Sequence, residues 1–286
     1  VTRIINRMQE SIDADMPIHR IQCPIEDSIA MFQKRGMTSK VQLLESQDEL
    51  YTYYYKLDNS IDYFYGPLLT RTGMLHLFRL VPYFDGLLLR IPSEKDPSVL
   101  EEYVEQKKML GVIREHQQWQ NILRVRTVGE FNKAILAGYA TDLINVSEAL
   151  QSKKLSDIAD DIARRKSRLV LIAGPSSSGK TTTAKRLAIL MMACGLRPYT
   201  LSTDDYFVNR VDTPKDEYGE YDFECIGALD TKLFNEQMNA ILRCEEVELP
   251  RYDFLTGKRV YEGRKLRIGP TDIIILEGNH ALKPIL

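Results

Sequence analysis

The sequence GPSSSGKT at residues 174–181 decides the fold of the second half of the chain. It satisfies the pattern G-x-x-x-x-G-K-[ST], in which glycines let the backbone wrap around phosphate oxygens and successive amides point inward as an anion nest. The apolar run at residues 169–173 predicts a buried parallel strand before the loop, and residues 182–193 predict a helix after it. Strand, loop and helix in this order identify a phosphate-binding P-loop.

The loop residues have expected roles in holding a nucleotide. Lys180 can reach the β- and γ-phosphates of ATP, the Thr181 hydroxyl can ligate Mg²⁺, and the dipole of the following helix adds positive potential. We therefore expect ATP and Mg²⁺ as cofactors. The expected nucleotide-binding residues are Gly174, Ser176, Ser177, Ser178, Gly179, Lys180, Thr181 and Thr182.

Acidic residues follow two further predicted strands. Residues 199–202 precede Asp204 and Asp205, and residues 272–276 precede Glu277. In a parallel sheet these acids meet at the carboxyl edge, where a carboxylate can hold Mg²⁺ or accept a proton from an attacking hydroxyl. The alternative is that an aspartate caps the next helix. We favour the functional role for Asp204 and leave both roles open for Asp205.

The pattern along the chain predicts three parts. Residues 1–92 form an α+β module, residues 93–166 a helical connector, and residues 167–286 the first part of an α/β domain with a doubly wound parallel sheet, truncated at its end. In the module the expected helices are residues 4–12 and 27–35, and the expected strands are residues 41–44, 50–57 and 75–80. In the connector we expect helices at residues 99–109 and 128–162, the second interrupted near Lys153.

Composition limits the class of protein. Of the 286 residues 44% are hydrophobic and 27% are charged, which predicts a globular chain with a buried core. The formal net charge of −2 provides no global basic field for nucleic acid. No apolar run is long enough to span a membrane, no signal peptide is evident, and the four cysteines are scattered, so we expect free thiols, a cytoplasmic location and no membrane partner. The chain begins at Val1 and ends at Leu286, and we expect a fragment whose open sheet edge favours a homo-oligomer.

The part from Arg168 onward resembles the uridine kinase/phosphoribulokinase family of P-loop kinases. The matching segments, in the same order and spacing, are GPSSSGKTT, LSTDDYF, YDFECIGALD, LPRYDFLTGKR and IIILEG. The resemblance implies ATP-dependent phosphorylation of a nucleoside 5′-hydroxyl of the uridine or cytidine type. It implies that Asp204 and Lys180 are catalytic, the first as base, and that Thr181, Asp204 and Glu277 hold the metal.

The resemblance also implies a set of substrate-binding residues. Asp222 aligns best with the acid that holds the ribose hydroxyls, with Glu224 as the alternative. The full expected set is Asp204, Phe207, Asp222, Glu224, Tyr252, Phe254 and Arg259. Three positions depart from the family pattern: Phe223-Glu224 replaces His-Pro, Phe207 replaces Tyr, and Gly257 replaces a base-reading His. The phosphoryl-transfer residues therefore match, whereas base recognition is altered.

The first part of the chain contains Arg7-Met8, Asp27-Ser28-Ile29-Ala30, residues 62–67, Thr72-Gly73 and Phe78-Arg79-Leu80. On these segments residues 5–90 are similar to the second additional domain of threonyl-tRNA synthetases, which edits mischarged tRNA. The synthetase signature D-x-C-x-G-P-H reads DYFYGPL at residues 62–68, with Phe64 and Leu68 in place of Cys and His. Neither side chain can ligate a metal, so we expect a non-catalytic module. The alternative function is an RNA- or tRNA-associated P-loop NTPase switch; a basic surface on residues 1–90 would favour it, and the acidic overall balance speaks against it.

Overall fold

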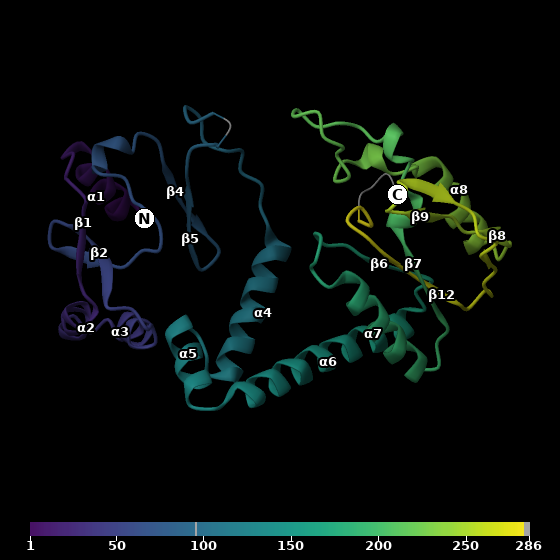
Figure 1. Ribbon diagram of the computed structural model, residues 1–286, viewed down its shortest axis with the longest axis horizontal. Helices are drawn as coiled ribbons and strands as arrows, with labels where there is room; N and C mark the ends of the chain where they lie inside the picture. The colour runs from purple at the N-terminus through teal and green to yellow at the C-terminus, as the bar shows by residue number, and fades with distance from the viewer. Residues whose placement is uncertain (95, 283–286) are drawn as a thin grey trace. The chain divides into compact units, whose positions relative to one another are not determined.

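The computed structural model describes residues 1–94 and 96–282. The chain divides into two compact units, Val1–Ser147 and Glu148–Leu286, with the boundary inside the long helix α6 (Ala140–Arg165). Figure 1 shows the elements of each unit along the chain. The three-part division expected from the sequence stays a prediction, and its last residues, 283–286, lie outside the described residues.

An antiparallel sheet and two helices form the core of the first unit. The sheet has the order β1-β2-β3, with bounds β1 (His19–Pro24), β2 (Tyr51–Leu57) and β3 (Ser60–Asp62). Helices α2 (Ile25–Lys34) and α3 (Thr38–Glu45) pack on it. Phe32, Val41 and Leu44 are buried between them, with Tyr54 of β2 packed against the cluster. The α+β expectation for this part therefore holds.

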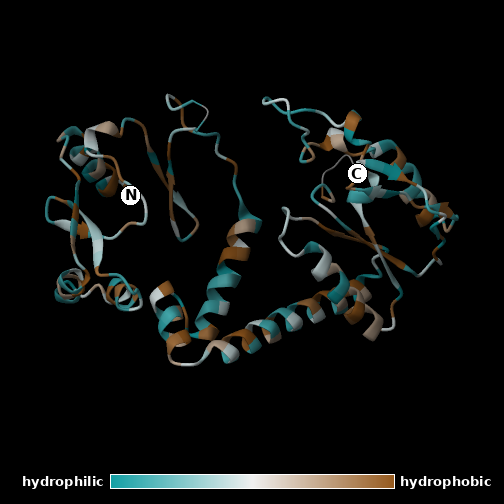
Figure 2. Ribbon diagram, in the orientation of Figure 1, coloured by the Kyte–Doolittle hydropathy of each residue, from teal (hydrophilic) through white to brown (hydrophobic). Residues whose placement is uncertain are grey.

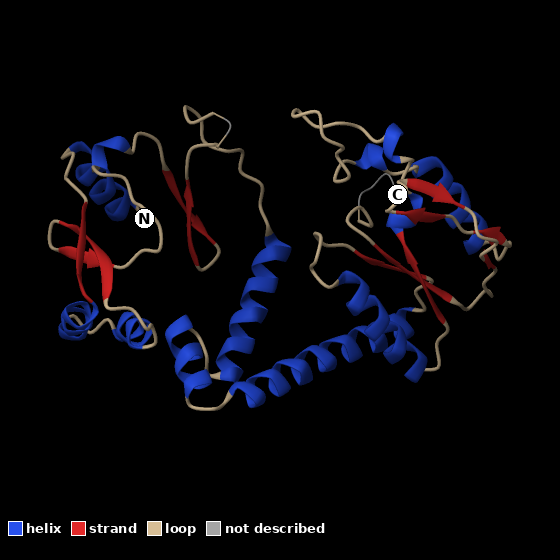
Figure 3. Ribbon diagram, viewed as in Figure 1, coloured by secondary structure: helices blue, strands red, loops and turns tan. Residues whose placement is uncertain are grey.

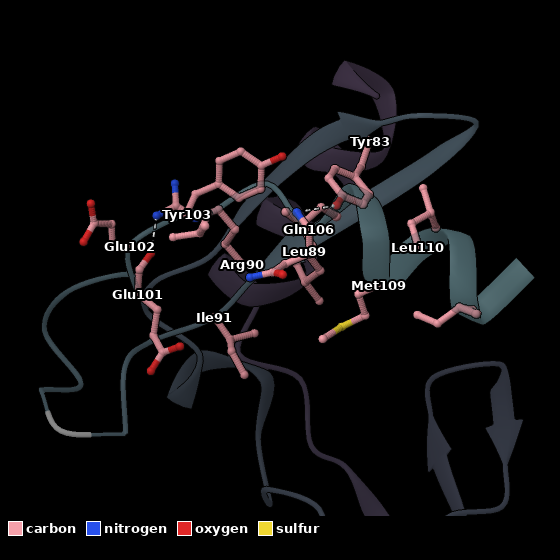
Figure 4. A pocket seen from close by; sticks show the side chains of 13 residues that line it. Tyr83, Leu89, Arg90, Ile91, Glu101, Glu102, Tyr103, Gln106, Met109 and Leu110 are labelled. Atoms are coloured by element: carbon pink, nitrogen blue, oxygen red, sulfur yellow. Dashed lines mark hydrogen bonds between the residues drawn. The ribbon is translucent and has the colours of Figure 1, made fainter. Parts of the chain in front are cut away.

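The rest of this unit contains a short first helix, a hairpin and two further helices. Their bounds are α1 (Thr2–Asp13), η1 (Thr72–Met74), β4 (Arg79–Tyr83), β5 (Gly86–Arg90), α4 (Lys107–Leu123) and α5 (Val128–Leu136). An apolar groove of about 360 Å³ lies between the hairpin and α4. Figure 4 shows Tyr83, Leu89 and Met109 among the side chains that line it.

Three of the expected elements in this unit are wrong. Residues 41–44 belong to helix α3, because Val41 and Leu44, three residues apart, meet the same core. Residues 99–106 are not helical: Leu100 bridges to Pro92, and the Gln106 amide donates to the Tyr83 hydroxyl over 3.2 Å. The strand expected at residues 75–80 begins only at Arg79.

The expected interruption of a helix near Lys153 is also wrong. Helix α6 runs unbroken through Lys153, and the break lies before it, at Gly138, whose φ of +87° ends α5 in a backbone form that favours glycine. Figure 2 shows hydrophobic and hydrophilic residues side by side along α4 and α6; α6 buries Leu155, Ala159 and Ile162, whereas no residue of α4 is buried.

A parallel three-stranded sheet forms the centre of the second unit. Its order is β6-β12-β7, with bounds β6 (Leu169–Ile172), β7 (Pro198–Ser202) and β12 (Ile273–Glu277). All residues of β12 are buried, as the apolar sequence IIILE predicts for a strand with both faces covered. The strands run in the same direction (Figure 3), so the segments that follow them leave from one edge.

Alternate residues of β12 enter two separate core layers. Ile273 and Ile275 pack with Ala159 of α6 and Leu187 of α7 (Lys180–Ala193). Ile274 and Leu276 pack on the other side with a cluster that includes Phe234, Met238 and Ile241 of α8 (Thr231–Leu242). Helices therefore cover both faces of a parallel sheet, which confirms the predicted α/β class.

Two small antiparallel ribbons complete the described part of this unit. β9 (Arg251–Asp253) pairs with β10 (Lys258–Val260), and β8 (Val247–Glu248) pairs with β11 (Lys265–Leu266). Among the described residues, no helix combines the length and apolar character that crossing a membrane requires.

Candidate active site

Residues 174–179 connect β6 to α7 with the backbone form that a phosphate site needs. Ser177 and Gly179 both have positive φ angles, 60° and 84°, and such reversals turn neighbouring amides into an anion nest. A Cβ on Gly174 would lie 2.8 Å from Ser178 Oγ, so only glycine fits there without a shift of that side chain. The loop leads directly into the amino-terminal turn of α7, where the helix dipole favours an anion.

Lys180 opens α7 and extends back over the loop. Its Nζ donates to the carbonyl oxygen of Pro175 over 2.9 Å and to Oδ1 of Asn279 over 2.8 Å. Both contacts keep the ammonium group at the carboxyl edge of the sheet. The remaining predicted loop residues, Ser176 and Thr182, are exposed on either side of it.

The first turn of α7 is joined to the end of β12. Thr181 Oγ1 donates to Oε1 of Glu277 over 3.0 Å. Glu277 is 6% exposed, so its carboxylate is removed from bulk water and needs such a partner. The hydroxyl and the carboxylate that the sequence assigns to one metal site are therefore in direct contact.

Asp204 lies beside this pair, after β7. Ser202 is in register with Glu277, and the Ser202 hydroxyl accepts a 3.2 Å hydrogen bond from the Asp204 amide. Ser202, and neither aspartate, thus caps the short 3₁₀ turn η2 (Thr203–Tyr206). Burial, followed by repulsion from Glu277, raises the pKa of Asp204, and Lys180 partly offsets the increase.

Asp205 faces a different set of groups. Its carboxylate accepts a hydrogen bond from the Tyr252 amide and lies 3.8 Å from Nη1 of Arg264. Burial raises its pKa, whereas the Tyr252 amide and Arg264 lower it. Of the two aspartates, Asp204 is therefore the one whose charge interacts most with Glu277 and Lys180.

The donor set at the sheet edge fits Mg²⁺. Thr181, Asp204 and Glu277 offer a hydroxyl and two carboxylates, the hard oxygen ligands that this ion takes together with water and substrate phosphates. A divalent cation would also relieve the repulsion between the two carboxylates that raises the pKa of Asp204. No three His, Cys, Asp or Glu side chains in residues 1–94 and 96–282 are grouped to hold a metal. Water and nucleotide phosphates would complete the coordination of such an ion.

An aromatic cluster covers the segment that follows Asp204. Phe207 is buried and meets Phe223, Tyr252 and Phe254 edge to face, with ring centroids 5.7, 5.5 and 6.4 Å apart. Phe254 is 59% exposed, so one side of the cluster is open to solvent. The Tyr252 hydroxyl is buried and has no hydrogen-bond partner among the described residues.

The remaining predicted substrate residues, Asp222, Glu224 and Arg259, have different hydrogen-bond partners. Asp222 Oδ1 accepts from the amides of Glu224 and Cys225 over 2.9 and 3.1 Å, a local turn. Glu224 Oε2 accepts from Nδ2 of Asn279 over 2.9 Å and so is connected to the P-loop edge. Arg259 Nη1 donates over 2.8 Å to Asp230, the residue that caps α8, which ties it to the frame of the domain.

Asn279 was not among the predicted site residues. It follows β12 by two positions and contacts both Lys180 and Glu224. The only sequence signal was its place just beyond the strand-end acid. His280, next to it, is 2% exposed, and neither ring nitrogen has a hydrogen-bond partner in the described part of the chain.

The aligned signature residues of the first unit lie in a different setting. The Phe64 ring meets Tyr55 edge to face at 6.0 Å, and the Leu68 amide donates to the Tyr55 hydroxyl over 3.3 Å. The first is an aromatic packing contact and the second is a backbone hydrogen bond. The resemblance of this unit to a synthetase editing domain stays a prediction.

Together the loop, lysine and strand-end acids define a P-loop nucleotide-binding domain. Residues 169–283 match the model of the Phosphoribulokinase / Uridine kinase family. The resemblance predicted for the second part of the sequence is thereby confirmed.

The chain is also similar to individual known proteins. The chain is 34% identical over 110 residues to a uridine kinase of Lactobacillus helveticus, covering 38% of this chain and 51% of that protein. It is 30% identical over 111 residues to a uridine kinase of Halobacterium salinarum, covering 39% and 47%. The chain thus spans about half the length of these relatives. The structure of a possible uridine kinase from Bacillus stearothermophilus shares 27% identity, with a TM-score of 0.37, over 46% of this chain and 75% of that one.

Proposed function

We propose that this protein transfers the γ-phosphoryl group of ATP to a hydroxyl of a nucleoside, with the 5′-hydroxyl of uridine or cytidine as the leading acceptor. The proposal is supported by the position of the P-loop residue Lys180 beside two carboxylates, Asp204 and Glu277, at one edge of the sheet. Lys180 and Glu277 act electrostatically on Asp204, and Thr181 is hydrogen-bonded to Glu277. This arrangement combines a phosphate cradle with a candidate base.

The residues of this chain suggest how the transfer proceeds. The loop amides and Lys180 hold the β- and γ-phosphates, and Lys180 neutralises charge that develops on the γ-phosphate. The acceptor oxygen bonds to the γ-phosphorus, the bond to the β–γ bridging oxygen breaks, and ADP leaves. Asp204 accepts the proton of the acceptor hydroxyl, for which its raised pKa suits it better than an ordinary aspartate. Mg²⁺, held by Thr181, Asp204 and Glu277, would supply charge neutralisation at the phosphates.

The charges around the site favour an acceptor without a phosphate of its own. Asp204 and Glu277 lie at the reacting centre, and Glu224 is connected to it through Asn279. Arg259, the cation expected on the acceptor side, is paired with Asp230. A phosphorylated sugar would bring two negative charges toward these carboxylates, whereas a nucleoside would bring none. The open aromatic cluster around Phe207 and Phe254 offers a flat apolar surface for a base.

A substrate panel tests the proposal. The protein is incubated with ATP, Mg²⁺ and one acceptor at a time from a set of nucleosides, sugars and ribulose 5-phosphate, and products are identified by mass spectrometry. We expect a nucleoside monophosphate, and no product from ribulose 5-phosphate. ATP hydrolysis without any phosphorylated acceptor would contradict the kinase proposal and favour a nucleotide-driven switch. Salt-dependent binding of tRNA by the same protein would then test the RNA-associated alternative.

A further inference from the structure

Arg210, a residue outside the predicted site, contacts the turn that carries Phe254. Residues 254–257 connect β9 to β10, and we refer to them as the Phe254 turn. The Phe254 ring is the exposed member of the aromatic cluster, and it meets the buried Tyr252 ring edge to face with centroids 5.0 Å apart. Arg210 is half-buried and begins the short 3₁₀ turn η3 (Arg210–Asp212).

Arg210 is hydrogen-bonded to both ends of the Phe254 turn. Its backbone amide donates to the carbonyl oxygen of Gly257 over 2.8 Å, and its Nη2 donates to the carbonyl oxygen of Phe254 over 2.5 Å. A hydrogen bond from a charged guanidinium group is stronger than one between neutral groups. One residue therefore fixes the first and the last position of the turn.

The Arg210 side chain also lies against Gly257. A Cβ at position 257 would lie 2.8 Å from Arg210 Cβ, 2.9 Å from its Nε and 3.0 Å from its Cζ. Gly257 has a φ of +67°, a backbone form that favours glycine. A side chain at position 257 would therefore displace Arg210 from its present place, and the glycine is what lets the arginine reach the turn.

The other two arginines of this ribbon are paired elsewhere. Arg251, on β9, forms an ion pair with Glu262 whose closest atoms, Nη1 and Oε2, lie 3.1 Å apart. Arg259, on β10, donates to Asp230. In the described part of the chain, Arg210 is therefore the one of these three arginines whose guanidinium group is hydrogen-bonded to the Phe254 turn.

We propose that Arg210 is a positioning residue that fixes Phe254 as a wall against which the base of the acceptor nucleoside stacks. The inference rests on the proposed function, because it assumes an acceptor with a planar base. Binding to a turn that is already held in place costs less conformational entropy than binding that must first order the turn. Stacking uses the face of the base and so depends little on its exocyclic groups. Arg210 thereby acts on uridine and cytidine alike.

Steady-state kinetics with each nucleoside, at saturating ATP and Mg²⁺, test the inference first. We expect Arg210→Ala to raise the KM for uridine and for cytidine about tenfold, with kcat and the Kd for ATP unchanged. Arg251→Ala, on the same ribbon, is the matched control and should behave as wild type does.

The outcomes separate this inference from the proposed function. No turnover of any nucleoside by wild-type protein would overturn both together. With wild-type protein active, an unchanged KM in Arg210→Ala would overturn the inference alone. A rise in KM for only one of the two nucleosides would also overturn it, because Arg210 would then contact the edge of the base itself.

A double-mutant cycle separates action through Phe254 from general structural damage. If Arg210 acts through Phe254, the double variant Arg210→Ala with Phe254→Ala should have the KM of Phe254→Ala alone. Gly257→Ala, which displaces Arg210 but keeps its charge, should raise the KM as Arg210→Ala does. Gly263→Ala, at another glycine of positive φ but with no neighbouring atom, should leave the KM unchanged. Additive rises in the cycle, or equal KM values in the two glycine variants, would overturn the inference.

Discussion

Thr181 Oγ1 lies 3.0 Å from Oε1 of Glu277, a contact that spans 96 positions of sequence. It joins the first turn of the P-loop helix to the end of the central strand, and Asp204 approaches the same point from the neighbouring strand. The domain therefore brings three oxygen-bearing side chains to one edge of its sheet, which is the basis of the predictions that follow.

The first prediction concerns the metal. Thr181→Val keeps the shape of the side chain and removes its hydroxyl, so one ligand and the partner of Glu277 are lost together. We expect the Mg²⁺ concentration for half-maximal activity to rise at least about tenfold. Activity is measured in a Mg²⁺ titration at fixed ATP. Thr183→Val, two positions further along α7, is the control and should titrate as wild type does; an unchanged Mg²⁺ requirement in Thr181→Val would remove Thr181 from the metal site.

The second prediction separates the two aspartates. Asp204→Asn removes the proposed base, so we expect kcat to fall by about 10²- to 10⁴-fold while the Kd for ATP stays nearly unchanged. Asp205 faces Tyr252 and Arg264, and Asp205→Asn should reduce kcat far less. Steady-state kinetics and equilibrium ATP binding on both variants test this. A wild-type kcat in Asp204→Asn, with an inactive Asp205→Asn, would show that the base is the other residue.

The third prediction is a dependence of stability on pH. Because burial and Glu277 raise the pKa of Asp204 in the folded protein, its ionised form costs stability at neutral pH. Asp204→Asn should therefore raise Tm at pH 7. The gain should shrink as the pH falls through the raised pKa and vanish below the ordinary aspartate value of about 4.

Asp253, whose pKa is shifted in the opposite direction from that of Asp204, serves as the control. The Thr256 hydroxyl lowers the pKa of Asp253, so the ionised form of this residue is favoured in the folded protein. Asp253→Asn should not raise Tm at pH 7. Melting curves of both variants across this pH range decide the matter, and a lower Tm for Asp204→Asn at pH 7 would contradict the account of its burial.

The fourth prediction concerns the turn that carries Asn279. A Cβ on Gly278 would lie 1.7 Å from Thr203 Oγ1, and Thr203 is fully buried. We expect Gly278→Ala to lower the free energy of unfolding by about 3 kcal/mol, the upper range for overpacking. Gly263→Ala meets no neighbouring atom and should cost about 1 kcal/mol from its positive φ. Urea unfolding measures both, and Thr203→Ala should restore part of the loss in Gly278→Ala; equal losses in the two glycine variants would refute the steric argument.

The sequence predicts the centre of the P-loop domain because its signals are local. The loop at residues 174–181 and the strand at residues 273–277 each contain their own pattern, and parallel strands must bring their carboxyl ends together. The contact between Lys180 and Asn279 could not be predicted in this way, since it joins residues 99 positions apart and depends on the turn after β12.

The first unit shows where periodicity misleads. A pattern of four residues, 41–44, is too short to distinguish a strand from a helix. The segment is helical, as part of α3, because Val41 and Leu44 then pack together with Phe32. Residues 99–106 carry a helical pattern, yet the bridge between Leu100 and Pro92 and the hydrogen bond from the Gln106 amide to the Tyr83 hydroxyl hold their ends outside a helix. In both cases a tertiary contact overrides a local preference.

The most direct test of the central claim follows a labelled phosphoryl group. γ-Labelled ATP is mixed with uridine and Mg²⁺, and the label is traced with wild-type protein and with Lys180→Ala, whose lost contacts to Pro175 and Asn279 lie at the loop and leave the core layers untouched. We predict label on the uridine 5′-oxygen with wild type, and none with a folded Lys180→Ala. Label found only in inorganic phosphate, or equal transfer by Lys180→Ala, would contradict the assignment of this site as a nucleoside kinase centre.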